Sequence, residues 1–268
     1  MTIQTAFKNA GITRPIQTQL FIGGEFVDAI GGGTIDVLNP FDNSKICEIA
    51  EAREEDVDRA VEVAKAAFPT WSRMDAADRG QLLLKLADAI EENAEELVRL
   101  EALDTGHPVR DARKLDVPRT ARCYRYFGGM ADKVEGTLPP VYPGFINYVQ
   151  REPLGVVGQV IPWNFPLMFT AWKMAPALAA GNTIVIKPSE ITPLSILRVA
   201  ELMKEVGMPD GVVNVVPGYG HTAGARLSEH PDVKKIAFTG STATGRRIVE
   251  ASAGNLKKVQ LELGGKGP

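Results

Sequence analysis

The sequence predicts an α/β fold built on a doubly wound, five-stranded parallel sheet. From residue 153 onward, five apolar runs alternate with four segments of helical periodicity. The runs are apolar on both faces, which is typical of parallel strands that are covered by helices on either side. The helical segments between them supply the crossovers that parallel strands need.

Turn and capping residues place the boundaries of these elements. The first helix of this region is expected to end at Gly181, and the second to begin with Thr192 as its cap and Pro193 in its first position. The predicted strands cover residues 154–162, 182–188, 211–218, 233–240 and 257–265, and the predicted helices cover 166–181, 192–207, 221–230 and 241–254.

The residues before this region are expected to form strands first and helices afterwards. Alternating apolar residues around a Gly-Gly turn predict strands between residues 20 and 50. Apolar residues at i, i+3, i+4 and i+7 predict a helix from residue 54 that ends at Pro69. A second helical segment, 76–106, is expected to end at Gly106, and a third, 109–134, is interrupted or started by Pro118.

Residues 136–150 are expected to form an arm. The stretch GTLPPVYPGFINYVQ reads as two short strands around Pro143 and Gly144. A hairpin that projects between larger elements often pairs with another subunit. We therefore expect this segment to take part in oligomerisation.

Composition and charge restrict the function classes that suit this chain. With 44% hydrophobic and 24% charged residues among 268, the sequence is typical of a soluble globular protein of one large or two ordinary domains. The net charge of −3, with no basic tail, gives no indication that the partner is nucleic acid or an anionic membrane. No run is long enough to span a bilayer.

Cysteine content and the N-terminus indicate the compartment. Cys47 and Cys123 are the two cysteines, too few for a disulfide framework, which suits a reducing environment. The N-terminal residues lack the apolar core and the cleavage site of a secretory signal, and they are poor in Arg. A cytoplasmic location is therefore expected.

Polar residues and glycines follow the predicted strands at the positions where ligands bind in such sheets. They are candidates for binding or catalysis because the carboxyl ends of parallel strands meet at one edge. No metal site is expected from the sequence. The candidates are Asn164, Lys187, Glu190, Gly218, Gly220, Gly240 and Ser241, together with Glu262 inside the last strand.

The junction at Gly240 and Ser241 is suited to phosphate binding. Free N–H groups at a helix start attract phosphate, glycine lets the backbone approach closely, and Ser241 can cap the helix and donate to an oxygen. An ordinary N-cap explains the same residues equally well. The stretch around Gly220, GYGHTAG, imitates a dinucleotide fingerprint but has the wrong spacing, which favours a tight turn.

Lys187 and Glu190 lie one turn beyond a strand end. The lysine could reach ribose or phosphate, and the glutamate could accept both ribose hydroxyls, which favours a cofactor without a 2′-phosphate. Taken alone, these two residues also suit an exposed ion pair near a helix start.

Asn164 and Glu262 are the candidates for catalysis. Pro162 and Pro166 make the backbone around Asn164 rigid, so its amide could donate to a developing oxyanion; a turn-forming Asn is the alternative. Glu262 lies in an apolar run, and burial would raise its pKa toward that of a general base. The alternative is a carboxylate that is paired with a lysine.

Taken together, these segments resemble the successive signatures of the NAD(P)-dependent aldehyde dehydrogenases. The resemblance is carried by VIPWNFPLMFTAWKMAPALAAGN, IVIKPSEITP, FTGSTATG and LELGGK, and by FIGGEFVDA, DVLNPFDNSKICEIAEA and ALDTGHP before them. It implies a Rossmann-like NAD(P)-binding domain over 1–135 and 151–268, with 136–150 as part of an oligomerisation arm. It also implies oxidation of an aldehyde to a carboxylic acid by a homodimer or homotetramer.

The resemblance assigns roles to single residues. Asn164 would be the oxyanion donor and Glu262 the base that activates water. Lys187 and Glu190 would hold the adenosine ribose, so NAD is favoured, although Lys187 leaves NADP possible. The other cofactor contacts would come from Ser241 beside Gly240 at the pyrophosphate, Gly220 near the adenine, and Ile161 and Trp163 along the cofactor cleft.

The sequence departs from the family pattern at the nucleophile. In the family, the essential cysteine follows the LELGGK glutamate on a catalytic domain that is expected to be absent here. Cys47 and Cys123 lie far from the predicted cleft in the sequence and are expected to be structural. We therefore expect no aldehyde oxidation by the 268-residue chain. A non-catalytic module that holds NAD or joins subunits, and a remnant that does not fold stably, are the alternatives.

Overall fold

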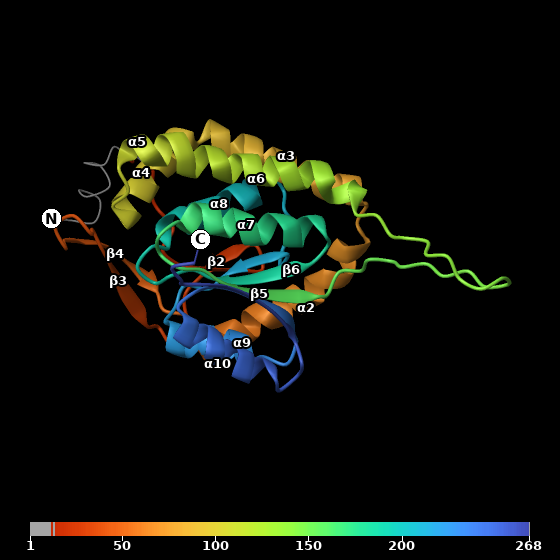
Figure 1. The fold of residues 1–268 in the computed structure, drawn as a ribbon. Coiled ribbons are helices and arrows are strands. Elements are labelled where there is room, and N and C mark those ends of the chain that lie inside the picture. Colours follow the sequence, from red (N-terminus) through yellow and green to blue (C-terminus); the bar gives the residue numbers. More distant parts are fainter. Residues whose placement is uncertain (1–11, 13, 268) are drawn as a thin grey trace.

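The computed structural model describes residue 12 and residues 14–267. Its main sheet, of which β5 and β6 are labelled in Figure 1, contains the five predicted parallel strands in the spatial order β7-β6-β5-β8-β9. This arrangement confirms the doubly wound α/β fold. The strands are β5 (Val156–Val160), β6 (Thr183–Lys187), β7 (Val213–Val215), β8 (Val233–Gly240) and β9 (Lys258–Leu263).

The sheet is larger than the sequence predicts. An antiparallel hairpin, β1 (Leu20–Ile22) and β2 (Glu25–Val27), pairs with β7 through Phe21 and Val215 and extends the sheet to seven strands. The Gly23-Gly24 turn of this hairpin has positive φ values of 66° and 81°, which glycine adopts without strain. The residues of β1 are all buried, and this explains why the hairpin is part of the sheet.

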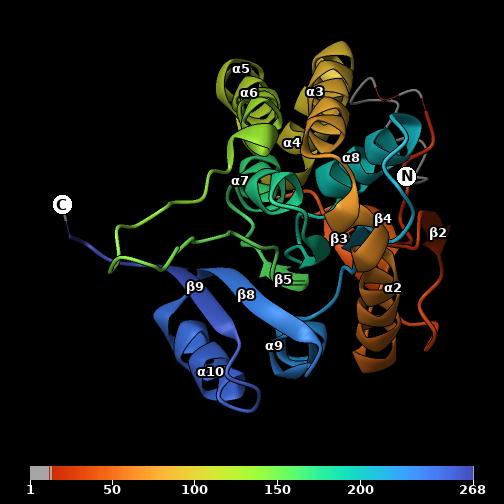
Figure 2. The same cartoon turned by 90° about the vertical axis from the view of Figure 1, so that its right-hand side faces the viewer.

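Helices cover both faces of the sheet. Figure 2 shows α3, α6, α7 and α8 on one side, with α2, α9 and α10 on the other. Every residue of β5, β6 and β7 is buried, as expected for strands between two helical layers. The helices after β5 are α7 (Pro166–Ala179), α8 (Leu194–Glu205), α9 (Ala225–Glu229), which follows the π-helical turn η3 (Gly220–Gly224), and α10 (Thr242–Ser252).

Two predicted helix boundaries before β5 are wrong. Helix α2 (Glu54–Arg73) continues through Pro69, because the fully buried Trp71 anchors its last turn in the core. The segment 76–106 forms two helices, α3 (Ala76–Glu92) and α4 (Ala94–Thr105), which are separated at Asn93. The side chain of Asn93 donates to the carbonyl of Ala89 (2.8 Å) and so helps to close α3. Helix α4 ends at Gly106 with φ 76°, as predicted.

The third helical segment contains a π-helical turn. It is composed of α5 (Val109–Asp111), η1 (Ala112–Asp116), α6 (Val117–Met130) and η2 (Ala131–Lys133). Pro118 lies in the first turn of α6, but η1 runs into α6 without a break, because Asp116 and Val117 both have αR backbone angles. The N–H of Val117 donates to the carbonyl of Ala112, which is the spacing of a π-helix. Of the two alternatives for Pro118, the structure therefore supports an interruption within a helical segment.

Helix α8 is not capped by Thr192 as the sequence predicts. Pro193 is the N-cap residue, and the hydroxyl of Thr192 is buried without a hydrogen-bond partner. The carboxylate of Asp104, at the end of α4, instead accepts the N–H of Leu194 (2.8 Å). A buried carboxylate from another helix therefore caps the N-terminus of α8 in place of a residue that is near in the sequence.

Two smaller parts stand apart from the main sheet. Strands β3 (Thr34–Leu38) and β4 (Lys45–Ala50) form an antiparallel pair that contains Cys47. Residues 136–150 project from the body (Figures 1 and 2), but they contain one isolated bridge, Thr137 to Val149, in place of two strands. No helix in the described part of the chain is long and apolar enough to cross a membrane.

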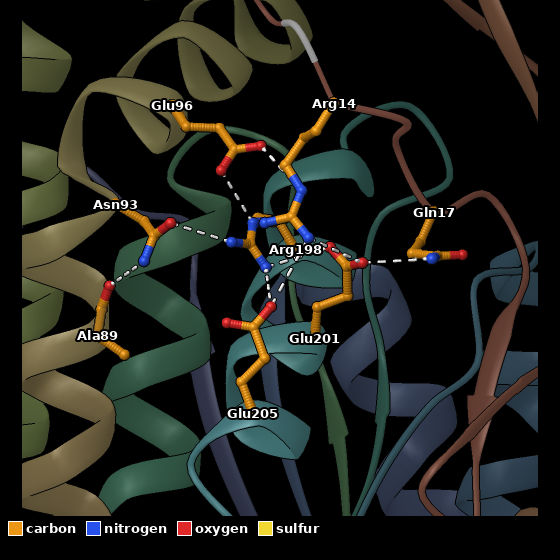
Figure 3. A network of polar contacts seen from close by, with 8 residues as sticks. All are labelled: Arg14, Gln17, Ala89, Asn93, Glu96, Arg198, Glu201 and Glu205. Atoms are coloured by element: carbon orange, nitrogen blue, oxygen red, sulfur yellow. Dashed lines mark hydrogen bonds and ion pairs between the residues drawn. The ribbon is translucent and has the colours of Figure 1, made fainter.

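A buried arginine connects α8 to α4. Arg198 is 3% exposed and donates to Asn93 Oδ1 (3.0 Å) and to three glutamates, which Arg14 also approaches (Figure 3). Its guanidinium is thus fully paired, and this makes its burial tolerable. The three glutamates are Glu96 at 3.0 Å, Glu201 at 3.2 Å and Glu205 at 3.1 Å from Arg198.

Helices α3 and α6 cross closely at two glycines. A Cβ on Gly80 would lie 2.5 Å from the carbonyl oxygen of Gly128, and a Cβ on Gly128 would lie 2.9 Å from that of Gly80. Both distances are shorter than van der Waals contact, and in each case the obstacle is backbone. Glycine is therefore required for this approach.

We expect Gly80→Ala to lower the free energy of unfolding by about 1–3 kcal/mol, the usual cost of overpacking a core. Gly129→Ala is the control, because Gly129 lies next to Gly128 in α6 but has open space around the position of its Cβ. The control should be neutral or stabilising, since Ala favours helix more than Gly does. Urea unfolding followed by circular dichroism measures both; equal effects would contradict the close-contact explanation.

Candidate active site

A groove of about 1120 Å³ lies between α7 and the β5–β8–β9 part of the sheet. Five of the predicted site residues line it, although they come from three separate strand ends. Its size suits a large organic ligand rather than an ion. The five residues are Trp163, Asn164, Gly240, Ser241 and Glu262.

Asn164 is half-buried in the turn between β5 and α7. Its Oδ1 is buried and accepts no hydrogen bond. An Asn that forms a turn uses this oxygen to accept a nearby backbone N–H, so the turn-forming alternative is not what the structure contains. Trp163, beside it, is 57% exposed.

Glu262 is exposed, so the predicted burial of its carboxylate is wrong. Side chains alternate along β9: Gln260 and Glu262 line the groove, whereas Leu261 and Leu263 lie against Gly245 of α10. The apolar neighbours of Glu262 in the sequence therefore belong to the opposite face of the strand.

Lys173 of α7 also lines the groove, and sequence reasoning missed it. It is 9% exposed, and burial lowers the pKa of its ammonium group to about 8, while the negative charge of Glu262 raises it. Lys173 and Glu262 therefore interact through their charges, but they do not form the ion pair that the alternative reading requires. A lone lysine in the apolar run TAWKMAPALAA was the available signal.

Ser241 is the N-cap of α10. Its hydroxyl accepts the N–H of Thr244 (3.2 Å), which is the ordinary capping interaction. Gly240 and Ser241 both line the groove, so the positive end of the helix dipole opens onto it. Capping and phosphate binding are compatible here, because a cap satisfies only one of the free N–H groups in the first turn.

Lys187 and Glu190 form a second part of the site at the carboxyl end of β6. Lys187 Nζ lies 2.9 Å from Glu190 Oε2, and Lys187 is 3% exposed, so the pair is not the exposed one considered above. Burial lowers the pKa of Lys187, and the charge of Glu190 opposes this shift. Turn η3 lies beside the pair, since a Cβ on Gly224 would be 3.6 Å from Lys187 Cδ.

Gly220 and Ile161 occupy different environments. Gly220 is exposed at the start of η3, and a Cβ there would meet open space. Ile161 is 2% exposed and belongs to the core, and its N–H donates to the carbonyl of Lys187 (3.2 Å). Its side chain therefore does not line the groove.

Neither cysteine lies in the groove. Burial raises the pKa of Cys47 in β4 to about 12, and that of Cys123 in α6 to about 11. A thiol with so high a pKa carries almost no thiolate near neutral pH and is a poor nucleophile. The described residues of the groove therefore include an amide, a carboxylate, an ammonium group and a helix N-terminus, but no thiolate.

The groove and its surroundings fit a dinucleotide. The N-terminus of α10 suits a pyrophosphate, and Glu190 is a carboxylate acceptor of the kind that binds ribose hydroxyls. Gly240 leaves no room for a side chain, because a Cβ there would lie 2.5 Å from Phe238 Cζ.

Comparison with known proteins agrees with this geometry. The model of the aldehyde dehydrogenase family matches residues 26–268. The mitochondrial aldehyde dehydrogenase of Leishmania tarentolae is 51% identical over 94% of this chain and 51% of its own length. The human mitochondrial enzyme is 51% identical over 93% of this chain and 49% of its own. The chain spans about half the length of these curated relatives.

The chain is also similar to solved structures. A putative aldehyde dehydrogenase from Burkholderia cenocepacia is 74% identical with a TM-score of 0.93, over 94% of this chain and 52% of that one. PnpE, solved in complex with nicotinamide adenine dinucleotide, is 73% identical with the same TM-score and the same coverage. The family model, the relatives and the fold agree: this chain belongs to the aldehyde dehydrogenase family.

Proposed function

We propose that this chain binds NAD and supplies part of the active site that oxidises an aldehyde to a carboxylic acid. The observation that carries the proposal is the convergence of Asn164, Glu262 and the N-terminus of α10 on one groove. Membership of the family and the NAD complex of PnpE support the choice of chemistry and of cofactor.

In the proposed reaction, Asn164 stabilises the negative charge that develops when a thiolate adds to the aldehyde carbon. Its amide nitrogen would donate to the new oxyanion, an interaction that is stronger in the transition state than in the substrate. NAD supplies the hydride acceptor. Loss of hydride from the adduct leaves a thioester, and attack by water on that thioester releases the acid and regenerates the thiolate.

Glu262 would take the proton from the attacking water. It is exposed to the groove, so it can meet both water and substrate. The charge of this carboxylate raises the pKa of Lys173, which burial lowers to about 8, so the two groups interact across the groove. A free carboxylate beside a lysine of lowered pKa can pass the proton onward, which general-base catalysis requires before the next turnover.

The nucleophile is proposed to come from polypeptide outside this sequence. Cys47 and Cys123 are buried or half-buried and lie away from the groove. The same observation favours a second candidate function, a module that holds NAD without turnover. The two functions share the cofactor site and differ in whether a reactive thiolate meets the groove.

We propose NAD over NADP, and a second copy of the chain as partner. Glu190 lies at the carboxyl end of β6, where its charge would repel a 2′-phosphate. The arm 136–150 displays apolar side chains that are suited to burial against another subunit. Those exposed most are Leu138, Tyr142, Phe145, Ile146 and Tyr148.

The cofactor proposal is tested by titrating the chain with NAD and NADP in a calorimeter. We expect NAD to bind more tightly, and Glu190→Gln to lower NAD affinity about tenfold, the usual effect of losing a charged hydrogen bond. The substitution should also reduce the ratio of NAD affinity to NADP affinity, because it removes the charge that repels the 2′-phosphate. Glu92→Gln, an exposed residue of α3, is the control. Failure of NAD to bind would refute the proposed function.

We expect neither cysteine to support turnover. The 268-residue chain should produce no NADH from an aldehyde and NAD, because both thiols have pKa values of about 11 or above. Cys123→Ser and Cys47→Ala should bind NAD as the wild type does. Turnover by the wild type that Cys123→Ser abolishes would show that the half-buried thiol is the nucleophile after all.

The charge interaction across the groove predicts a pKa shift. We expect Glu262→Gln to lower the pKa of Lys173 further below about 8, because the carboxylate charge is what raises it. Lys257 is a matched control: its pKa is also about 8, but the charge that raises it is that of Glu229. Carbon-13 NMR of methylated lysines should show Lys257 responding to Glu229→Gln and not to Glu262→Gln. If the pKa values of Lys173 and Lys257 changed equally in both variants, each lysine would not have the separate carboxylate partner that we expect.

A further inference from the structure

A second cluster of polar side chains lies behind the turn that contains Asn164. It is composed of Glu101 in α4, His107 in the following loop and Asp116 in η1. One oxygen or ring nitrogen from each residue lies within 4.8 Å of those of the other two. His107 Nδ1 is 2.8 Å from Asp116 Oδ2.

The charges of this cluster are poorly compensated. Glu101 is 0% exposed, and its Oε2 is buried without a hydrogen-bond partner. Asp116 is 1% exposed, and His107 is the partner in its ion pair. Asp104, one turn further along α4, adds another buried carboxylate with an unpartnered oxygen, Oδ1.

Such an arrangement needs a positive charge or a proton. An unpaired carboxylate in an apolar interior is costly, and proteins avoid the cost by protonation or by binding a cation. The unpartnered oxygen of Glu101 is the group that a cation would satisfy.

We propose that Glu101, His107 and Asp116 bind a divalent transition-metal cation of the Zn²⁺ class. One imidazole nitrogen and two carboxylate oxygens are donors that such cations accept, whereas Mg²⁺ and Ca²⁺ prefer oxygen alone. The three donors lie within 4.8 Å of one another, and bonds of about 2.0–2.2 Å would require them to move closer together. The side chain of His107 is 23% exposed, which gives the cation access from solvent and leaves room for a water ligand.

The proposed metal would stabilise the turn that contains Asn164. Glu101 Oε1 accepts the N–H of Leu167 (3.5 Å), and the ring of His107 contacts that of Phe165 edge-on at 5.0 Å between centroids. Both contacts lie within three residues of Asn164. A cation that fixes Glu101 and His107 would thereby restrict this turn, a structural role that does not depend on the proposed oxidation.

The experiment uses the full 268-residue chain after removal of metal with EDTA. ZnCl₂ is titrated by calorimetry, with MgCl₂ as the comparison cation. We expect one Zn²⁺ per chain, much weaker binding of Mg²⁺, and a melting temperature that rises with ZnCl₂. His107→Gln and Asp116→Asn should each weaken Zn²⁺ binding at least tenfold, and circular dichroism checks that each variant is folded.

His230→Gln is the matched control. His230 also lies beside an aspartate, with Nε2 3.5 Å from Asp58 Oδ1, but that carboxylate is engaged by Arg226 at 2.6 and 2.9 Å. This variant should bind Zn²⁺ as the wild type does. The visible absorption of bound Co²⁺ in the wild type is a second measurement that needs no variant, and nitrogen and oxygen ligation should give d–d bands.

Two results would overturn the proposal. One is the absence of Zn²⁺ binding and of Co²⁺ bands in the folded wild type, which would mean that the cluster holds no cation. The other is Zn²⁺ binding that His107→Gln leaves unchanged, which would place the cation elsewhere. Coenzyme binding is measured separately, so failure of this inference and failure of the proposed function are distinguishable.

Discussion

The organisation of this molecule depends on the burial of β5, β6 and β7 on both faces. Each residue of these strands is covered by a helical layer, so the strands themselves can hold few groups for chemistry. Reactive side chains must lie where the strands end, and this is where Asn164, Glu190 and Ser241 are found. The apolar core thus determines which residues can meet a ligand.

The same burial explains how far the sequence could predict the fold. Apolar runs identified all five parallel strands, and the pattern is strongest in β5, β6 and β7, which are covered on both faces. The β1–β2 hairpin was predicted as strands but not as part of the sheet. The sequence of a three-residue strand does not indicate which other strand it pairs with. The predictions based on Pro69 and Thr192 were wrong because tertiary contacts override local signals. The burial of Trp71 keeps α2 helical beyond Pro69, and the carboxylate of Asp104 caps α8 in place of Thr192.

The candidate site was predictable where backbone geometry determines function. Ser241 at a strand-to-helix junction caps α10 as its position indicates, and Lys187 pairs with Glu190 at the expected strand end. Glu262 was predicted to be buried and is exposed, because an edge strand with one covered face can look like a buried one. The sequence did not predict the cluster of Glu101, His107 and Asp116, because these residues are brought together only by the fold of η1 and of the loop after α4.

The cap that Asp104 provides for α8 has a consequence for the order of folding. The carboxylate and the N–H of Leu194 are separated by 90 residues in the sequence, so α8 gains its cap only after α4 has docked. Arg198, further along α8, likewise needs Asn93 and Glu96 from the same part of the chain. Each of these two helices thus depends on contacts with the other. We therefore expect α4 and α8 to unfold together, so that fraying of one helix also loosens the other.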